Sequence, residues 1–505
     1  MNLFAQFTQH YHARREHVMF EEDDGRRWTY DDVMRISNRL LVALDDCGLK
    51  HGDRLLVQTG KSVEVVVLYL TCLRAGIVFV PLNTAYQREE LTYFINDADP
   101  ALIVVDSPDV LTTSNRPVRT LMGDTNSLLG TKRPRGDVDW VTAENEEPLS
   151  AASVADKSID ATTAAVIIYT SGTTGRSKGA VLSHGNLFHN ASALVESWGF
   201  STRDTLLHIL PVFHVHGLLI ALNTAFLSGA SVRFCGRFEP ESVCRLLPAC
   251  SVLMGVPTHY TRLLDVSAFG PACLPSIRVF ISGSAPLQPE TFARFEARTG
   301  HRILERYGMS ETNILCSNPL AGERIAGTVG YALRDTEIRI ADDEDVALDS
   351  DQSGHVQVRG QGVFKGYWRR PELNAREFTP DGFFRTGDLG ALDESGRLRL
   401  VGRAKDLIIS GGLNVYPAEL EQFLDAQPGV VESAVIGVAD ADFGERVEAF
   451  VVVDTTGPAS VGKLAEACRD GLANFKRPKA FHLIESLPRN TMGKVQKTML
   501  RARRQ

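Results

Sequence analysis

Apolar residues along the first 300 positions alternate between helical and strand spacing. The segment 28–48 has apolar positions at helical spacing and ends at Gly48. A strand pattern over 53–60, a helix pattern over 62–76 and a second strand pattern over 77–83 come next. Similar apolar runs stop at glycine or proline in the segments 164–172, 203–211, 251–257 and 277–283. This repetition predicts an α/β fold with parallel sheets in αβα layers, whose ligands bind at the carboxyl ends of the strands.

The pattern changes after about residue 320. Segments 336–364 and 397–403 alternate polar and apolar residues and contain tight turns, which predicts an antiparallel, β-barrel-like subdomain. Segment 430–454 predicts two strands of a small α+β unit. A strand pattern ends and charged residues begin at Gly402–Asp406. We therefore expect a large N-terminal domain over 1–404 and a small, mobile C-terminal domain over 405–505.

Composition limits the kind of protein and the partners that can be expected. A chain of 505 residues with 44% hydrophobic and 23% charged residues is typical of a globular protein of two to four domains. Its net charge of −8 favours neither nucleic acid nor an acidic membrane as a partner. The eight cysteines form no C-x-x-C pair, which favours reduced, buried thiols. With no signal-peptide core and no long apolar span, we expect a cytoplasmic protein without a membrane partner.

The strongest chemical signal is the glycine- and hydroxyl-rich stretch Tyr169–Gly179, which follows an apolar strand pattern. Its glycines allow a tight turn that aims backbone N–H groups at an anion, and its lysine adds a positive charge for a phosphate. The spacing does not match a Walker A loop. A plain polar surface turn is the alternative. The candidate nucleotide ligands here are Thr170, Ser171, Gly172, Thr173, Thr174, Gly175 and Lys178.

Five further motifs accompany this loop in a characteristic order: Leu73–Asn83, Glu305–Thr312, Phe384–Leu389, Gly402–Asp406 and Pro488–Lys494. With them the chain resembles, nearly end to end, the adenylate-forming superfamily of acyl-CoA synthetases, nonribosomal adenylation domains and luciferases. It departs in small ways, with Ser177 where proline is common and Ser310 where threonine is usual. The resemblance implies that ATP activates a carboxylic acid as an acyl-adenylate, which then passes its acyl group to coenzyme A, with ATP, Mg²⁺ and coenzyme A as cofactor and substrates.

The resemblance also assigns roles to matching positions. Glu311, with Thr170, would hold Mg²⁺, which takes few protein oxygens beside phosphates and water. Asp388 would accept from the ribose hydroxyls, with Arg403 donating nearby; a turn cap is the alternative for an isolated aspartate. The remaining nucleotide-site candidates are Ser284, Ala285, Pro286, Glu305, Arg306, Tyr307 and Ser310.

Domain movement is a further implication of the resemblance. Lys494 would be the catalytic lysine of adenylate formation, although a lysine after glycine is ordinarily a solvated loop residue. To reach the phosphate loop, the last domain must close over the first. Lys405 matches the hinge position, and Gly411 and Gly412 would border a pantetheine tunnel.

Two patterns are set aside as weak. His214 and His216 lie two residues apart, which would place them on one face of a strand and invite a zinc site, but no third ligand follows at suitable spacing. The resemblance instead makes His214 a residue between the acid and the thiol. Gly360–Gly366 misses the spacing of a dinucleotide fingerprint.

The acid pocket is expected from segments 254–262, 282–287 and 307–312. Arg262 could pair with a second carboxylate, with a surface arginine as the alternative, and Ser282, Gly308 and Met309 would contribute hydrogen bonds. Over both domains the chain most resembles malonyl-CoA synthetases, which act on malonate and often on methylmalonate. Three alternatives stay open: another short-chain or aromatic acyl-CoA synthetase, a carrier-loading adenylation enzyme, and an inactive nucleotide-binding scaffold.

Overall fold

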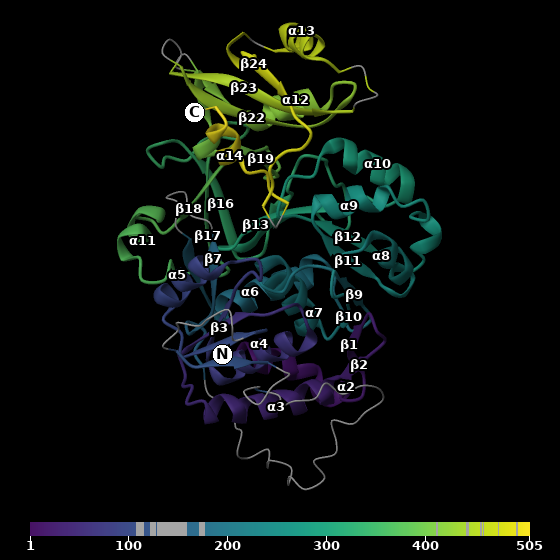
Figure 1. Ribbon diagram of the computed structural model, residues 1–505, viewed down its shortest axis with the longest axis vertical. Helices are drawn as coiled ribbons and strands as arrows, with labels where there is room; N and C mark the ends of the chain where they lie inside the picture. The colour runs from purple at the N-terminus through teal and green to yellow at the C-terminus, as the bar shows by residue number, and fades with distance from the viewer. Residues whose placement is uncertain are drawn as a thin grey trace.

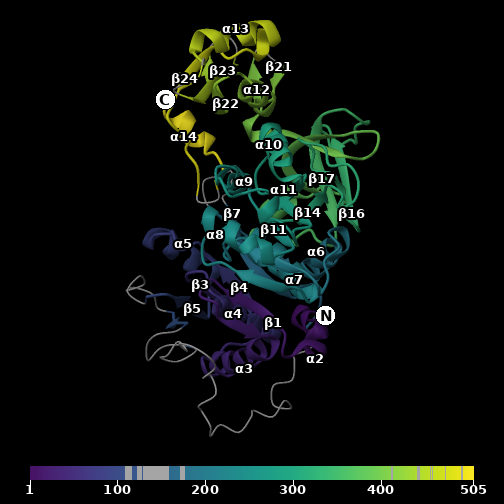
Figure 2. The ribbon, with the colours of Figure 1, turned by 90° about the vertical axis from the view of Figure 1, so that its right-hand side faces the viewer.

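The computed structural model shows a small C-terminal part, in yellow, above a larger body that holds the rest of the chain (Figures 1 and 2). It describes residues 1–107, 116–121, 128, 159–170, 177–410, 413–440, 444–454, 457, 459–472, 474–490 and 493–504.

The larger sheet of the body has nine strands in the order β15-β14-β13-β12-β11-β9-β10-β1-β2. Its six central strands pair in parallel, whereas β2 at one edge and β14 and β15 at the other are antiparallel. Strands β11 and β12, in the middle of the sheet, are buried along their whole length because both faces of the sheet are covered there. The bounds are β1 Val18–Glu22, β2 Arg27–Thr29, β9 Thr205–His208, β10 Ser231–Phe234, β11 Val252–Gly255, β12 Val279–Ser282, β13 Leu304–Met309, β14 Asn313–Ser317 and β15 Tyr331–Ala332.

A second sheet has six strands in the order β6-β5-β3-β4-β7-β8, all parallel except for the last pair. Its strands are β3 Arg54–Gln58, β4 Val78–Pro81, β5 Leu102–Val105, β6 Val118–Thr120, β7 Ala164–Thr170 and β8 Lys178–Ser183. The two sheets confirm the predicted α/β class. The loop expected to bind phosphate joins the antiparallel strands β7 and β8.

Helices fill the space around both sheets (Figure 2). All thirteen residues of α4 are buried, as expected for a helix covered on every side. The helices of this part are α1 Leu3–Phe7, α2 Tyr11–Arg14, α3 Tyr30–Asp46, α4 Val63–Ala75, α5 Arg88–Ala98, α6 His184–Ser197, α7 Asn223–Ser228, α8 Pro240–Leu246, α9 Pro257–Leu264, α10 Pro289–Thr299 and α11 Pro371–Glu377.

Two antiparallel units complete the fold. Strands β16 Thr336–Ala341, β17 Gly354–Gly360, β18 Phe384–Leu392 and β19 Leu398–Arg403 form the predicted antiparallel subdomain. The two strands predicted over 430–454 are β22 Val430–Asp440 and β23 Gly444–Val453, paired with each other. The C-terminal sheet also contains β20 Ile408–Ser410, β21 Leu413–Val415 and β24 Ala480–Leu483, with helices α12 Pro417–Asp425, α13 Val461–Gly471 and α14 Lys497–Ala502.

One sequence prediction was wrong. The segment around His214 and His216 is not a strand: a turn leads into the π-helix η3 (His216–Leu222), so the two imidazoles do not share a strand face. Gly217 explains the change of direction, because a Cβ there would lie 2.0 Å from the carbonyl oxygen of Pro211. Only a glycine lets the chain turn back so closely.

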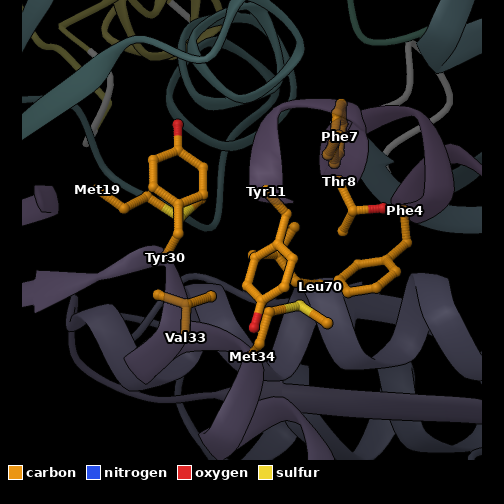
Figure 3. Close-up of a pocket in the computed structure, with 9 residues that line it drawn as sticks. All are labelled: Phe4, Phe7, Thr8, Tyr11, Met19, Tyr30, Val33, Met34 and Leu70. Atoms are coloured by element: carbon orange, nitrogen blue, oxygen red, sulfur yellow. The ribbon is translucent and has the colours of Figure 1, made fainter. Parts of the chain in front are cut away.

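A small apolar cavity lies where α1, α2, α3 and α4 meet near the N-terminus (Figure 3). Its volume of about 20 Å³ holds about one water molecule, so it is a packing gap and no substrate pocket. Its lining residues are Phe4, Phe7, Thr8, Tyr11, Met19, Tyr30, Val33, Met34 and Leu70.

Among the described helices, none combines the length and the apolar character that a bilayer crossing needs.

Candidate active site

Glu311 lies in the turn between β13 and β14, and two hydroxyl groups hold its carboxylate. Thr170, the last residue of β7, donates to Glu311 Oε1 at 3.3 Å. Tyr367, which the sequence analysis missed, donates to the same oxygen at 3.0 Å. The carboxylate is 5% exposed, so these donors fix its orientation in a mostly dry setting.

Lys178 begins β8 at the other end of the phosphate loop. Its ammonium group lies 4.7 Å from the ring centroid of Tyr367 and 3.7 Å from Glu377 Oε1. Tyr367 therefore contacts both the carboxylate and the lysine at the two ends of the loop. The predicted ligands Ser171, Gly172, Thr173, Thr174 and Gly175 lie outside the described residues.

Asp388, on β18, is buried and has a partner on each oxygen. Tyr307 donates its hydroxyl to Oδ2, and Arg403 donates Nε to Oδ1 at 2.7 Å. Burial raises the pKa of Asp388, and the charge of Arg403 opposes that shift. A ribose diol would share these oxygens with Tyr307 and Arg403.

The turn after β12 carries the predicted adenine-side residues. Ser284 adopts a left-handed backbone with φ of 71° and makes a 3.1 Å hydrogen bond with His216 Nδ1. Ala285 is partly buried and Pro286 exposed. Glu305 holds this turn in place, because its carboxylate accepts a hydrogen bond from the backbone N–H of Leu287 at 3.1 Å. Burial raises the pKa of Glu305 to about 7.

Arg306 is the least expected member of the site. Its guanidinium is buried without a described carboxylate partner, and its Nε and one Nη make no hydrogen bond. A Cβ at Gly283 would lie 2.5 Å from the guanidinium, so that glycine makes room for it. Strand alternation puts Arg306 on the opposite face of β13 from Tyr307. Burial lowers the pKa of Arg306 to about 10.

His214 and His216 lie near this cation and are neutral at physiological pH. Burial, then Lys494 and Arg306, lower the pKa of His214 to about 3. Burial and Arg306 also hold the pKa of His216 well below its usual value. A neutral imidazole can accept a proton or a hydrogen bond without adding positive charge.

The predicted acid-pocket residues divide into buried and exposed members. Arg262, on α9, is exposed, which agrees with the alternative of a surface arginine, whereas the buried arginine of the site is Arg306. Ser282 is fully buried with its hydroxyl unpaired. Gly308 and Met309, at the end of β13, are partly buried, as is Ser310 in the turn that follows.

The yellow segment that precedes α14 extends from the C-terminal part toward the body (Figures 1 and 2), and Lys494 belongs to this segment. It is close enough to Asp388, Glu311, Arg403 and Arg306 for their charges to affect its pKa. Although Lys494 as a whole residue is exposed, the surrounding protein desolvates its ammonium group and lowers its pKa. The structure thus brings Lys494 together with the predicted nucleotide-site residues.

The hinge and tunnel candidates are placed less fully. Lys405 is exposed in a short 3₁₀ turn that directly follows β19. Gly411 and Gly412 lie outside the described residues.

The side chains of this site are suited to bind a magnesium ion. Glu311 offers a hard oxygen, and both of its described hydrogen bonds go to Oε1, which leaves Oε2 available. No group of three or more His, Cys, Asp or Glu in the described part of the chain could hold a metal ion by itself. Mg²⁺ that is shared with nucleotide phosphates needs only one or two protein oxygens.

Family models and known relatives identify the family of this chain. The family model of AMP-binding enzymes matches residues 4–368, and the model of their C-terminal domain matches residues 419–494. The chain belongs to the AMP-binding, adenylate-forming enzyme family. As a member of this family it is an AMP-forming acyl-CoA ligase.

Three relatives of this AMP-binding enzyme show how its similarity is distributed. The ATP-bound crystal structure of MatB from Rhodopseudomonas palustris is 43% identical with a TM-score of 0.90, over 99% of this chain and 98% of that chain. The malonate–CoA ligase of Arabidopsis thaliana is 34% identical, over 95% of this chain and 85% of the relative. A long-chain-fatty-acid–CoA ligase of Mycobacterium tuberculosis is 33% identical, over 94% and 93%. Since ligases named for different acids are almost equally similar, whole-chain identity near one third does not fix the acid.

Proposed function

We propose that this enzyme is a malonate–CoA ligase that forms malonyl-adenylate from malonate and ATP and then malonyl-CoA. One observation carries the choice of acid: the unpaired, buried guanidinium of Arg306 beside the nucleotide site. A buried cation without a partner is costly, and a substrate anion can supply that partner. The malonate–CoA ligases among the relatives support the same acid.

The second carboxylate of a diacid is the group that this cation would bind. Arg306 presents a fixed set of donors that suits a carboxylate, whereas a monocarboxylic acid would leave it unpaired. Arg262, exposed on α9, would cover the same carboxylate from the solvent side. The unpaired hydroxyl of Ser282 adds a neutral donor.

In the first half-reaction, one malonate oxygen attacks the α-phosphorus of ATP, and the bond to pyrophosphate breaks. The chain contributes position and charge to this transfer. The ammonium group of Lys494 would lie between the attacking carboxylate and the α-phosphate. Asp388 and Tyr307 would hold the ribose end of the nucleotide. Magnesium, when bound at Glu311, would offset the negative charge of the phosphates.

In the second half-reaction, the sulfur of coenzyme A attacks the acyl carbon, and the bond from that carbon to the AMP oxygen breaks. The thiol must lose a proton as the carbon–sulfur bond forms. His214 is neutral, so its imidazole would accept that proton or a hydrogen bond from the thiol.

A competition assay tests the proposed function. The enzyme would receive ATP, Mg²⁺ and coenzyme A with equal amounts of malonate, methylmalonate, succinate, acetate and benzoate, and mass spectrometry would identify the thioesters. We expect malonyl-CoA as the main product, with one AMP and one pyrophosphate per thioester. A main product of acetyl-CoA or benzoyl-CoA would contradict malonate specificity. Acyl-adenylate without any CoA thioester would indicate a carrier-loading enzyme.

A further inference from the structure

Residues 488–490 and 493–496 pair as the two sides of a β-hairpin, and Lys494 lies on the second side. Arg489 and Val495 pair as an antiparallel bridge, and Gln496 donates its backbone N–H to the carbonyl of Pro488 at 2.8 Å. The backbone N–H of Lys494 donates to Asn490 Oδ1 at 2.9 Å, and its carbonyl accepts from Asn490 N–H at 2.9 Å. Lys494 therefore moves with the hairpin, and its position depends on how residues 488–496 are held.

Two ion pairs hold the two ends of this hairpin to the C-terminal sheet. Arg489, at the start, pairs with Glu432 on β22. Lys497, just past the end, pairs with Glu421 on α12 at 2.6 Å. The two pairs make β22, α12 and the hairpin one mechanical unit.

Asp425, at the end of α12, lies one helical turn beyond Glu421, and its Oδ1 is buried with no described hydrogen-bond partner. Burial, and then the charges of Glu421 and Glu432, raise the pKa of Asp425 to about 7. Lys497 and Arg489 pair with these two acidic neighbours. The base of the hairpin and Asp425 thus occupy one corner of the C-terminal part.

That corner touches the large domain. Gln288 Nε2 donates to Asp425 Oδ2 at 3.0 Å, across 137 positions of sequence. Gln288 directly precedes α10 and follows Leu287, whose N–H is fixed by Glu305. A short, well-supported path therefore runs from the nucleotide-side turn through Gln288 and Asp425 to the lysine hairpin.

We propose that the Gln288–Asp425 hydrogen bond is an interdomain latch that positions the Lys494 hairpin for adenylate formation. This inference rests on the proposed two-step ligase function. Both are positioning residues, because they act through the hairpin and touch no substrate. The latch is a single contact at the protein surface, so it opens readily when the C-terminal part moves for thioester formation.

Half-reaction kinetics test the latch. The variants are Gln288→Ala, Asp425→Ala, the double variant, and Asp425→Asn, which keeps an acceptor oxygen. Malonate-dependent ATP–pyrophosphate exchange reports adenylation, and malonyl-adenylate plus coenzyme A reports thioester formation. Loss of one hydrogen bond predicts that each alanine variant lowers exchange by about three- to tenfold, with thioester formation unchanged. The double variant should have the same exchange activity as the less active of the two single alanine variants, because all three lack the same contact.

Controls separate the latch from general damage. Gln422→Ala removes an exposed glutamine from the same helix and should leave both half-reactions unchanged. Asp425→Asn should retain most of the exchange activity. Equal losses in both half-reactions, strictly additive losses in the double variant, or unchanged exchange in Gln288→Ala would each overturn the latch.

A second readout does not depend on turnover. With ATP bound, hydrogen–deuterium exchange of the segment 488–496 should be faster in Gln288→Ala than in the unmodified enzyme. Unaltered exchange of this segment would overturn the latch. If instead the unmodified enzyme shows no pyrophosphate exchange with any acid, the proposed function fails, and the deuterium measurement still decides the contact.

Discussion

At the residue scale, Tyr367 is the clearest addition to the site. Its hydroxyl donates to Glu311 and its ring lies beside the ammonium group of Lys178. No sequence motif pointed to it, because it is 56 positions from Glu311 and directly follows a stretch that was considered only as a dinucleotide fingerprint. The side chain links the proposed magnesium ligand to the proposed phosphate ligand.

Removing the Tyr367 hydroxyl should weaken the binding of Mg²⁺. We expect Tyr367→Phe to lower malonate-dependent pyrophosphate exchange by about three- to tenfold, because Glu311 loses one of its two donors. The half-saturating Mg²⁺ concentration for ATP binding, measured by calorimetry, should rise. Tyr69→Phe is a matched control, since it removes a buried hydroxyl that donates to Asn223 far from the site. Equal effects in both variants would contradict the assigned role.

The two arginines make a second residue-scale prediction. Arg306→Met should reduce malonate use by about 10- to 150-fold, the loss expected for charge-assisted hydrogen bonds, and acetate use by much less. Arg262→Ala should shift the same ratio by less, because an exposed cation is already stabilised by water. The measurement is kcat/KM for each acid. An unchanged malonate-to-acetate ratio in Arg306→Met would remove this residue from acid recognition.

At the element scale, β13 shows what the sequence could predict and what it could not. The motif from Glu305 to Thr312 was divided by position along the sequence: Arg306 and Tyr307 were assigned to the nucleotide, and Gly308 and Met309 to the acid. In the strand, Tyr307 turns toward Asp388, whereas Arg306 lies near His214 and His216. Successive side chains of a strand point to opposite faces, so a strand prediction for this motif would have placed Arg306 and Tyr307 on opposite faces.

Apolar runs predicted most elements well, because buried strands and helices need them. The prediction of a strand after Pro211 was wrong for the same reason. A fully buried π-helix and a fully buried strand have the same apolar composition. The side-chain contacts between distant segments, such as Tyr367 with Glu311, left no periodic signal. They depend on the packing of whole layers.

The elevated pKa of Glu305 on β13 predicts a pH effect on stability. Its pKa of about 7 exceeds its ordinary value, so the folded state binds the extra proton and the free energy of unfolding falls as pH rises from about 4.5 to about 7. The full effect is at most about 3 kcal/mol. Glu305→Gln should remove this slope, while the raised pKa of Asp425 leaves a similar one.

Urea unfolding at pH 5.5 and pH 8 would measure the difference. Relative to the unmodified enzyme, Glu305→Gln should gain stability on going from the lower to the higher pH. A difference between the two proteins that does not change with pH would show that Glu305 is ionised in the folded state.

At the scale of the whole molecule, the site exists only where the C-terminal part meets the body. Lys494 comes from the end of the chain, while Glu311, Asp388 and Thr170 come from three separate units. The domain boundary near residue 404 stays a prediction, although the short turn after β19 falls there. The sequence could place these parts in order but not against one another.

Lys494→Ala tests this arrangement. The variant should lower pyrophosphate exchange by about 100- to 1,000-fold, because it removes a charge that acts in the transition state of phosphoryl transfer. Thioester formation from supplied malonyl-adenylate should remain largely intact. Comparable losses in the two half-reactions would reject a role confined to adenylation.

The backbone of Ser284 has a consequence for how this enzyme can change. A left-handed conformation is easy for glycine but costs other residues of order 1 kcal/mol, so the fold tolerates a locally unfavourable serine. Replacement by glycine would relax that turn and remove the Ser284 hydroxyl that hydrogen-bonds with His216 Nδ1. Selection for heat resistance alone would therefore drive this position toward a more stable protein in which His216 is held less firmly.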